Sequence, residues 1–248
     1  MWIFVILMYI LLDSARGSDL QMPIVEVKML GSGLHRKIVY TVHFNDSMAG
    51  SKCKYVLKQT LPAAMYVSTD ELKDLRRLKK LDSVFPRFVD IEVPTEKANS
   101  FDVFLRGVPK IEDSAILPIH YRYHAPHRVN RFASVQLPKS IIYINCPRNE
   151  EVLLEKYTTL DSSIKYCLNF DQLTIHSQTN ESINDDNCKW MLLQQAYHAK
   201  SSLTANIPLG NKNAYTRVLY GTIFISWFAA FWSFFCIFRQ LKSVKYKL

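Results

Sequence analysis

Apolar and polar residues alternate through much of the chain, and this pattern predicts β-strands. Ile38, Tyr40, Val42 and Phe44 alternate with the residues between them, as in a strand with one buried face. Similar short runs occupy residues 24–30, 54–61, 88–93, 101–105, 116–123, 132–137, 141–146, 164–170 and 203–208. Many short strands separated by turn residues are typical of a sandwich or barrel. The sequence therefore predicts a mainly β fold with an antiparallel β-sandwich-like domain.

One short helix interrupts this pattern. Residues 68–71 read Ser-Thr-Asp-Glu, a capping box in which the first and last side chains bind free N–H groups of the first helical turn. Leu72, Leu75 and Leu78 then fall on one face of a helix that is expected to end at about Lys80. We interpret this helix as structural.

Two apolar segments at the ends of the chain predict a membrane topology. Residues 3–12 form an apolar run of ten, too short to span a bilayer but typical of a signal peptide. Ala15 and Gly17 follow, so cleavage after Gly17 gives a signal peptide of residues 1–17. No Lys or Arg precedes the run, and the alternative is a buried N-terminal strand or helix.

The second apolar segment, residues 218–238, contains 21 residues without a charge. At about 1.5 Å per residue it is long enough to cross the hydrocarbon core of a bilayer. The basic tail, residues 239–248, is expected in the cytosol under the positive-inside rule. The prediction is a single-pass type I protein with a lumenal β-rich domain (residues 18–216) and a transmembrane helix (residues 217–238).

The formal net charge of +9 raises the question of nucleic-acid binding, but four of these charges lie in the last ten residues. The rest of the surplus is spread over the chain, without a zinc-finger, helix-turn-helix or RNP pattern. We interpret the charge as a solvated surface and an orientation signal, and expect no nucleic-acid partner.

Cysteines and sequons agree with an oxidising compartment. Cys53, Cys146, Cys167 and Cys188 form an even set outside the span and lack CxxC spacing. Three pairings are available. We favour Cys53–Cys146 with Cys167–Cys188, because the second closes a short loop; the alternative is that some remain free thiols. Two N-glycosylation sequons begin at the positions Asn45 and Asn180.

Catalytic motifs are absent from the sequence: it has no GxSxG, P-loop, GxGxxG, HExxH or Asp-x-Asp. His120 and His124 would lie roughly 13 Å apart on a strand, too far to share a metal ion. We therefore expect no catalytic residue, metal or cofactor. The surrounding segment is either a packed strand or a recognition surface, since Tyr and Arg are favoured at interfaces. Its candidate partner-binding residues are Pro118, His120, Arg122, Tyr123, His124 and Pro126.

The predicted span has two different faces. At about 100° per residue its small residues fall within an arc of about 60°, with the aromatic residues opposite. Small residues let membrane helices approach closely, so this face is a candidate site for a partner's membrane helices. The alternative is a plain anchor. The small face consists of Thr222, Ser226, Ala229 and Ser233.

Several stretches together resemble the PIG-X family. The most specific is the segment 117–126, Leu-Pro-Ile-His-Tyr-Arg-Tyr-His-Ala-Pro, which is similar to a family pattern LPxHxRYHxP. Other similar stretches lie at residues 34–36, 53–62, 65–67, 70–72, 90–94, 188–190 and 207–210, and at Cys146. The resemblance runs from about Leu34 to Phe238, and residues 147–187 match poorly.

The resemblance implies an endoplasmic-reticulum glycoprotein that stabilises a polytopic mannosyltransferase, PIG-M. That enzyme adds the first mannose, from dolichol-phosphate-mannose, to the glycosylphosphatidylinositol (GPI) precursor. The family implies no catalytic residue in this chain. Three alternatives remain: a p24-like cargo receptor, an adhesion receptor of immunoglobulin type and a lumenal enzyme. The chain lacks the long heptad helix of the first, and its Cys53 to Cys146 spacing is too wide for the second.

Overall fold

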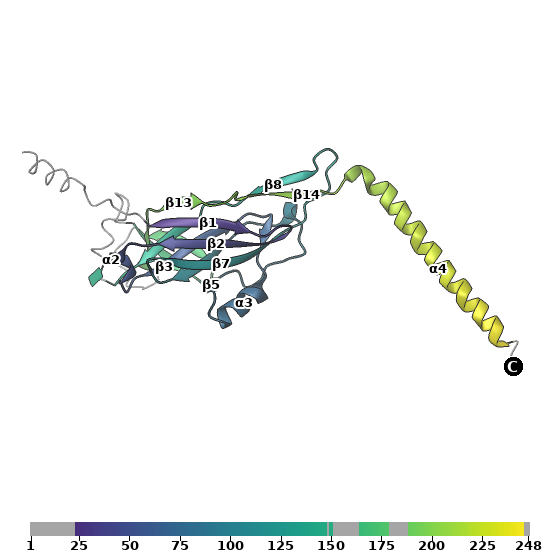
Figure 1. The fold of residues 1–248 in the computed structure, drawn as a ribbon, viewed down its shortest axis with the longest axis horizontal. Coiled ribbons are helices and arrows are strands. Elements are labelled where there is room, and N and C mark those ends of the chain that lie inside the picture. Colours follow the sequence, from purple (N-terminus) through teal and green to yellow (C-terminus); the bar gives the residue numbers. More distant parts are fainter. Residues whose placement is uncertain (1–22, 148, 151–163, 179–187, 246–248) are drawn as a thin grey trace, which may run out of the picture. The chain divides into compact units, whose positions relative to one another are not determined.

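The computed structural model in Figure 1 describes residues 23–147, 149–150, 164–178 and 188–245. Within these, the chain forms two compact units. The first runs up to Tyr123 and resumes over Ser134–Ile207, and the second comprises His124–Ala133 and the chain from Pro208 onward. The predicted signal peptide and the sequon at Asn180 lie outside the described residues. The sequence did not predict that residues 124–133 group with the C-terminal helix.

The first unit is built from two five-stranded sheets (Figure 1). In one, the strand order is β13 (Ala196–Ala199), β1 (Ile24–Leu30), β2 (His35–His43), β7 (Asp113–Tyr121) and β4 (Met65–Tyr66). In the other it is β12 (Met191–Leu192), β9 (Ile141–Asn145), β3 (Lys54–Leu61), β6 (Phe101–Gly107) and β5 (Ser83–Val84). Neighbours are antiparallel, except that β1 and β13 are parallel.

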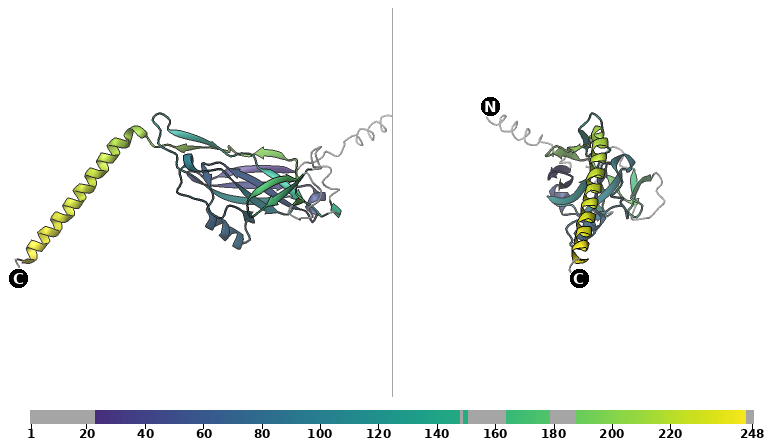
Figure 2. Two further views of the ribbon diagram at one scale, coloured as in Figure 1. Left: turned by 180° about the vertical axis from the view of Figure 1, so that it is seen from behind. Right: turned by 90° about the vertical axis from the view of Figure 1, so that its right-hand side faces the viewer.

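The two sheets lie face to face (Figure 2) and bury alternate residues of their strands between them. Val25 and Val27 of β1, and Ile38 and Tyr40 of β2, are fully buried. Tyr40 also donates a hydrogen bond of 2.8 Å to the buried Gln59 of β3, in the opposite sheet. The predicted β-sandwich-like domain is thus confirmed.

A second cluster covers the outer face of the β3 sheet. The hairpin of β10 (Lys165–Asn169) and β11 (Thr174–Gln178) contributes Leu168 to it. Leu168 packs with Val56, Phe104, Tyr143 and Trp190. The middle strands of this sheet therefore have parts buried on both faces: the consecutive residues Val56 and Leu57 of β3, and Phe104 and Leu105 of β6, are all buried.

Apart from the long C-terminal helix, the described residues also contain short helices and two further strands. They are α2 (Asp46–Ala49), α3 (Thr69–Arg77), the 3-10 turns η1 (Thr95–Lys97) and η4 (Lys212–Ala214), and the pair β8 (Phe132–Gln136) and β14 (Thr204–Pro208). Ser68 caps α3 by accepting a bond from the Glu71 N–H, as the capping box predicts. Helix α3 connects β4 to β5, the edge strands of the two sheets.

Two expectations about local structure were wrong. Residues 88–93 were expected to form a strand, but they run as a loop whose carbonyl groups bond to the Arg122 side chain instead of to a neighbouring strand. Leu78 was expected to share one face of α3 with Leu72 and Leu75 in a helix ending at about Lys80, but the helix ends at Arg77 and Leu78 is 54% exposed.

In the second unit, α4 (Tyr215–Lys245) is a continuous helix. Among the described residues there is one helix long and apolar enough to cross a membrane, Lys212–Gln240, and its large apolar side chains are exposed. A helix of similar length in a soluble core would be mostly buried. Residues 217–238, predicted as a transmembrane helix from the sequence, lie within α4.

Candidate functional site

Strand β7 carries the first part of the segment that the sequence singled out. It lies between β2 and β4, but β4 pairs with it only at His120 and Tyr121. Pro118 therefore has no β4 residue opposite it. Proline lacks a backbone N–H, but no hydrogen bond to β4 is lost here, because no strand pairs with Pro118 on that side. Pro118 is buried and His120 is half-buried.

Arg122 follows β7 and is 5% exposed. Its Nη1 donates to the carbonyl oxygens of Asp90 and Val93, at 2.6 and 2.9 Å. The guanidinium lies over the Tyr66 ring, 4.9 Å from its centroid, and its removal from water lowers the pKa of Arg122. Arg122 thus fixes residues 88–98, which comprise the loop over residues 88–94 and the turn η1, and are here called the 88–98 loop. The buried side chains of Pro118 and Arg122 present no surface to a partner.

Three exposed apolar side chains lie on the segments that Arg122 and Thr95 join. Tyr123 is 73% exposed, and its carbonyl accepts bonds from the backbone N–H and hydroxyl of Thr95. Phe88 and Ile91 in the same loop are 79% and 53% exposed. We call Phe88, Ile91 and Tyr123 the Tyr123 group: three water-exposed apolar residues whose segments are tied together through Arg122 and Thr95.

The last two candidates of this segment belong to the second unit. His124 is half-buried, and within the described residues its Nδ1 atom is buried without a hydrogen-bond partner. Pro126 is exposed.

The structure also brings together four side chains that were not linked from the sequence: His35, Tyr66, Glu71 and His120. His35 lies directly opposite His120 in the β2–β7 register, and their Nδ1 atoms are 3.4 Å apart. The other ring nitrogen of His120, Nε2, is 3.6 Å from Oε2 of Glu71 on α3. Tyr66 stacks on the His120 ring with centroids 5.0 Å apart.

This group of His35, Glu71 and His120 offers ligand atoms within 4.8 Å of one another. Two imidazole nitrogens bound to one tetrahedral zinc ion lie about 3.3 Å apart, close to the observed spacing of the Nδ1 atoms. Glu71, however, approaches the opposite nitrogen of His120, where it supports the ring as an outer carboxylate does. The two Nδ1 atoms are also within hydrogen-bond distance of each other, so that one ring can donate to the other. We assign no metal to this group.

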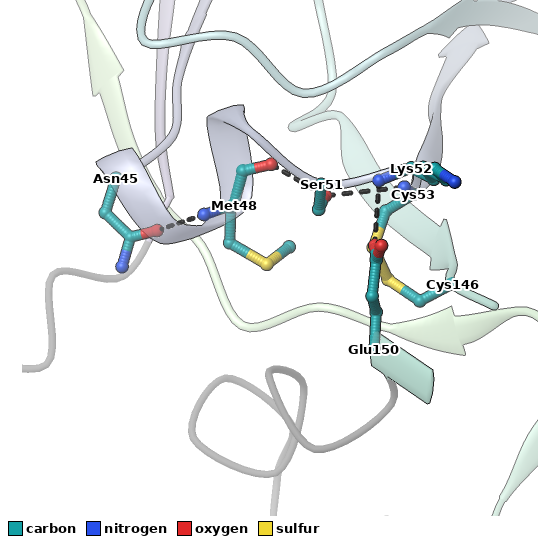
Figure 3. Close-up of a disulfide and its surroundings, with 7 residues drawn as sticks. All are labelled: Asn45, Met48, Ser51, Lys52, Cys53, Cys146 and Glu150. Atoms are coloured by element: carbon teal, nitrogen blue, oxygen red, sulfur yellow. Dashed lines mark hydrogen bonds between the residues drawn. A yellow bond between two sulfur atoms is a disulfide. The ribbon is translucent and has the colours of Figure 1, made fainter. Parts of the chain in front are cut away.

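The structure forms two disulfides, Cys53–Cys146 and Cys167–Cys188, the pairing that the sequence analysis favoured. Figure 3 shows the surroundings of the first: the Lys52 N–H donates to a Glu150 carboxylate oxygen at 2.7 Å.

The same view shows the sequon residue Asn45 at the start of α2. Its Oδ1 accepts a bond of 3.0 Å from the Met48 N–H. This cap uses the side-chain oxygen, whereas a glycan would attach through the Nδ2 nitrogen.

The small face of α4 carries hydroxyl groups that are hydrogen-bonded within the helix itself. The hydroxyl groups of Thr222, Ser226 and Ser233 donate to helix carbonyls three or four residues earlier, at 2.8–2.9 Å. Their polarity is therefore satisfied inside the helix. Together with Ala229 they present small, hydrogen-bonded side chains that suit close approach of a second helix.

Comparison with known proteins assigns the chain to a family. Human (Homo sapiens) GPI alpha-1,4-mannosyltransferase I, stabilizing subunit, is 29% identical over 136 residues, 52% of this chain and 53% of the human protein. The mouse (Mus musculus) protein of the same name is 24% identical over 193 residues, 75% of this chain and 70% of its own length. The chain thus matches about half the length of the human relative. The PIG-X / PBN1 family model matches residues 31–238, and the chain belongs to this family.

Proposed function

We propose that this chain is a non-catalytic stabilising subunit of the GPI mannosyltransferase I complex in the endoplasmic reticulum. That complex adds the first mannose to the GPI-anchor precursor. The observation that carries the proposal is family membership over residues 31–238, joined to relatives whose names give this role. In this proposal a PIG-M-like polytopic subunit holds the catalytic residues and uses dolichol-phosphate-mannose.

The proposed topology is type I, with the β-sandwich in the lumen and α4 across the membrane. Two disulfides support a lumenal position for the sandwich, because disulfides persist in oxidising compartments. One helix of sufficient length and apolar character supports a single span. The sequons at Asn45 and Asn180 are proposed glycosylation sites.

We further propose two contact surfaces for the catalytic subunit. In the membrane it is the small face of α4. On the sandwich it is the Tyr123 group, with His120 as a further candidate. In the second unit, His124 and Pro126 remain candidates of their own. Support for the Tyr123 group is the exposure of its three apolar side chains, since exposed aromatic residues on an ordered scaffold are favoured at interfaces.

Co-purification with the catalytic subunit tests the proposal. The tagged full-length chain is expected to recover the mannosyltransferase from detergent extracts, and Ser226→Leu with Ala229→Leu is expected to reduce recovery because bulky side chains prevent close helix approach. Phe231→Leu, on the opposite face of the helix, is the matched control and is expected to recover the enzyme normally.

The sandwich surface is tested in the same assay. Phe88→Ser with Tyr123→Ser is expected to lower recovery, whereas Ile111→Ser, which also removes an exposed apolar side chain, is expected to leave it unchanged. If the wild-type chain recovers no mannosyltransferase, the proposed function is refuted. If one of the two double variants retains full recovery, the contact surface that it alters is refuted, and the other surface stands.

A further inference from the structure

The loop formed by His124–Ala133, here called the 124–133 loop, is fastened to the start of the C-terminal helix. The His127 N–H donates to the Gly210 carbonyl at 2.9 Å, and the His127 carbonyl accepts from the Lys212 N–H at 3.1 Å. The ring Nδ1 of His127 accepts two further N–H groups of the loop, at 2.9 and 3.2 Å. The loop is therefore an ordered structure that lies directly beside the turn from which α4 begins.

These contacts fix the depth of the loop relative to a membrane crossed by α4. The charge-free residues 218–238 match the hydrocarbon core, so its boundary falls near Val218. Asn213 precedes this boundary by five residues, about 7–8 Å along a helix, and its side-chain amide donates to the Arg128 carbonyl at 3.3 Å. The headgroup layer is about 5–8 Å thick, so the loop backbone lies at its outer edge.

The side chains at this level fit a lipid surface. Val129 is 81% exposed and Phe132 is 60% exposed, which is unfavourable in water and favourable in the interfacial layer of a membrane. Residues 124–133 and 208–217 contain no Asp or Glu. Their cationic residues are all exposed: Arg128, Arg131, Lys212 and Arg217.

We propose that the 124–133 loop is a membrane-binding surface on the sandwich side of the bilayer. Val129 and Phe132 enter the interfacial layer, and Arg128 and Arg131 bind the phosphate groups of lipids. Apolar side chains flanked by arginines are typical of interfacial anchors, because the long cationic side chains reach phosphates while their stems cover apolar surface. The inference needs α4 to span the membrane but does not depend on the proposed mannosyltransferase role.

A depth measurement on the purified full-length chain tests this surface without any partner. Val129→Cys is made in a Cys236→Ser background, because Cys236 is the free cysteine of the described residues. The new thiol carries an environment-sensitive fluorophore, and the protein is reconstituted into phosphatidylcholine vesicles with lipid-borne headgroup quenchers. Ile111→Cys, 64% exposed in the first unit, is the control position.

The label at position 129 is expected to show blue-shifted emission and strong quenching, and the label at 111 neither. Adding an anionic phospholipid is expected to increase the quenching at 129, Arg128→Gln with Arg131→Gln is expected to abolish that increase, and free inorganic phosphate is expected not to compete. Equal, water-like signals at both positions would overturn the proposal. A signal at 129 that changes only when the mannosyltransferase is added would also overturn it, because the loop would then bind protein.

Discussion

The substitution Gly107→Ala tests whether the ring of Tyr55, which packs against Gly107, helps to hold the two sheets together. Gly107 on β6 lies opposite Tyr55 on β3, and the space for a Cβ atom at Gly107 is filled by the Tyr55 ring. That ring is 5% exposed, and its hydroxyl donates to Asp113 of the opposite sheet at 2.6 Å. Burial, and then the bond to the Asp113 carboxylate, raises the pKa of Tyr55.

The structure allows the cost of this substitution to be estimated. Forcing the ring aside costs about 1–3 kcal/mol in overpacking, and losing a hydrogen bond to a charged group costs about 1.5–3 kcal/mol more. These two costs sum to about 2.5–6 kcal/mol, and alanine in a strand is favoured over glycine by about 0.5–1 kcal/mol, so Gly107→Ala should lower the free energy of unfolding by about 1.5–5.5 kcal/mol. Gly50→Ala is the control, because the nearest atom to its added Cβ is at an ordinary 3.8 Å.

A double-mutant comparison identifies the cause. In a Tyr55→Val background the ring is gone, and alanine in a strand is favoured over glycine by about 0.5–1 kcal/mol. Gly107→Ala should then stabilise the protein slightly. Unfolding free energies of the full-length chain in detergent can be measured by pulse proteolysis in urea. An equal loss of stability in both backgrounds would refute the explanation.

Two further predictions concern the stability of the sandwich. In the chain-entropy relation, the 93-residue separation of Cys53 and Cys146 corresponds to about 4.7 kcal/mol, and the 21-residue separation of Cys167 and Cys188 to about 3.3 kcal/mol. Replacing both cysteines of the Cys53–Cys146 disulfide by serine should therefore lower the free energy of unfolding more than the same change at Cys167–Cys188, in the same urea assay. The reverse order would contradict this. Burial raises the pKa of Tyr40 well above its unfolded value of about 10, so the native state resists ionisation and stability should fall as pH rises above 10. The substitution Tyr40→Phe should reduce this loss of stability by up to about 1.4 kcal/mol per pH unit, measured from unfolding curves between pH 9 and 11. An unchanged dependence on pH would show that Tyr40 is not the source of the loss.

Much of the fold could be predicted because local pattern and final burial agree. The alternation at Ile38 to Phe44 reflects one buried face, and the sheet of β2 places Ile38, Tyr40, Val42 and Phe44 in the core. The capping box at Ser68 set the start of α3 through contacts within four residues. The long C-terminal helix could also be predicted from local sequence, because the apolar residues 218–238 form one uninterrupted run.

Features that depend on contacts distant in sequence were missed. His35 and His120 are 85 residues apart and meet only through the β2–β7 register. Residues 88–93 have the composition of a strand, but the Arg122 side chain bonds to the carbonyl groups of Asp90 and Val93, where a neighbouring strand would otherwise pair. Arg122 and Tyr123 are adjacent, and both were predicted to bind a partner. The structure buries Arg122 and exposes Tyr123, a difference that the sequence pattern did not reveal.

The central claim is that this chain supports a GPI mannosyltransferase without catalysing the reaction itself. It is tested most directly by the surface level of GPI-anchored proteins, measured by flow cytometry, in cells from which the chain has been removed. The account predicts loss of these proteins and their return when the wild-type chain is restored. Normal surface levels in cells without the chain would contradict it.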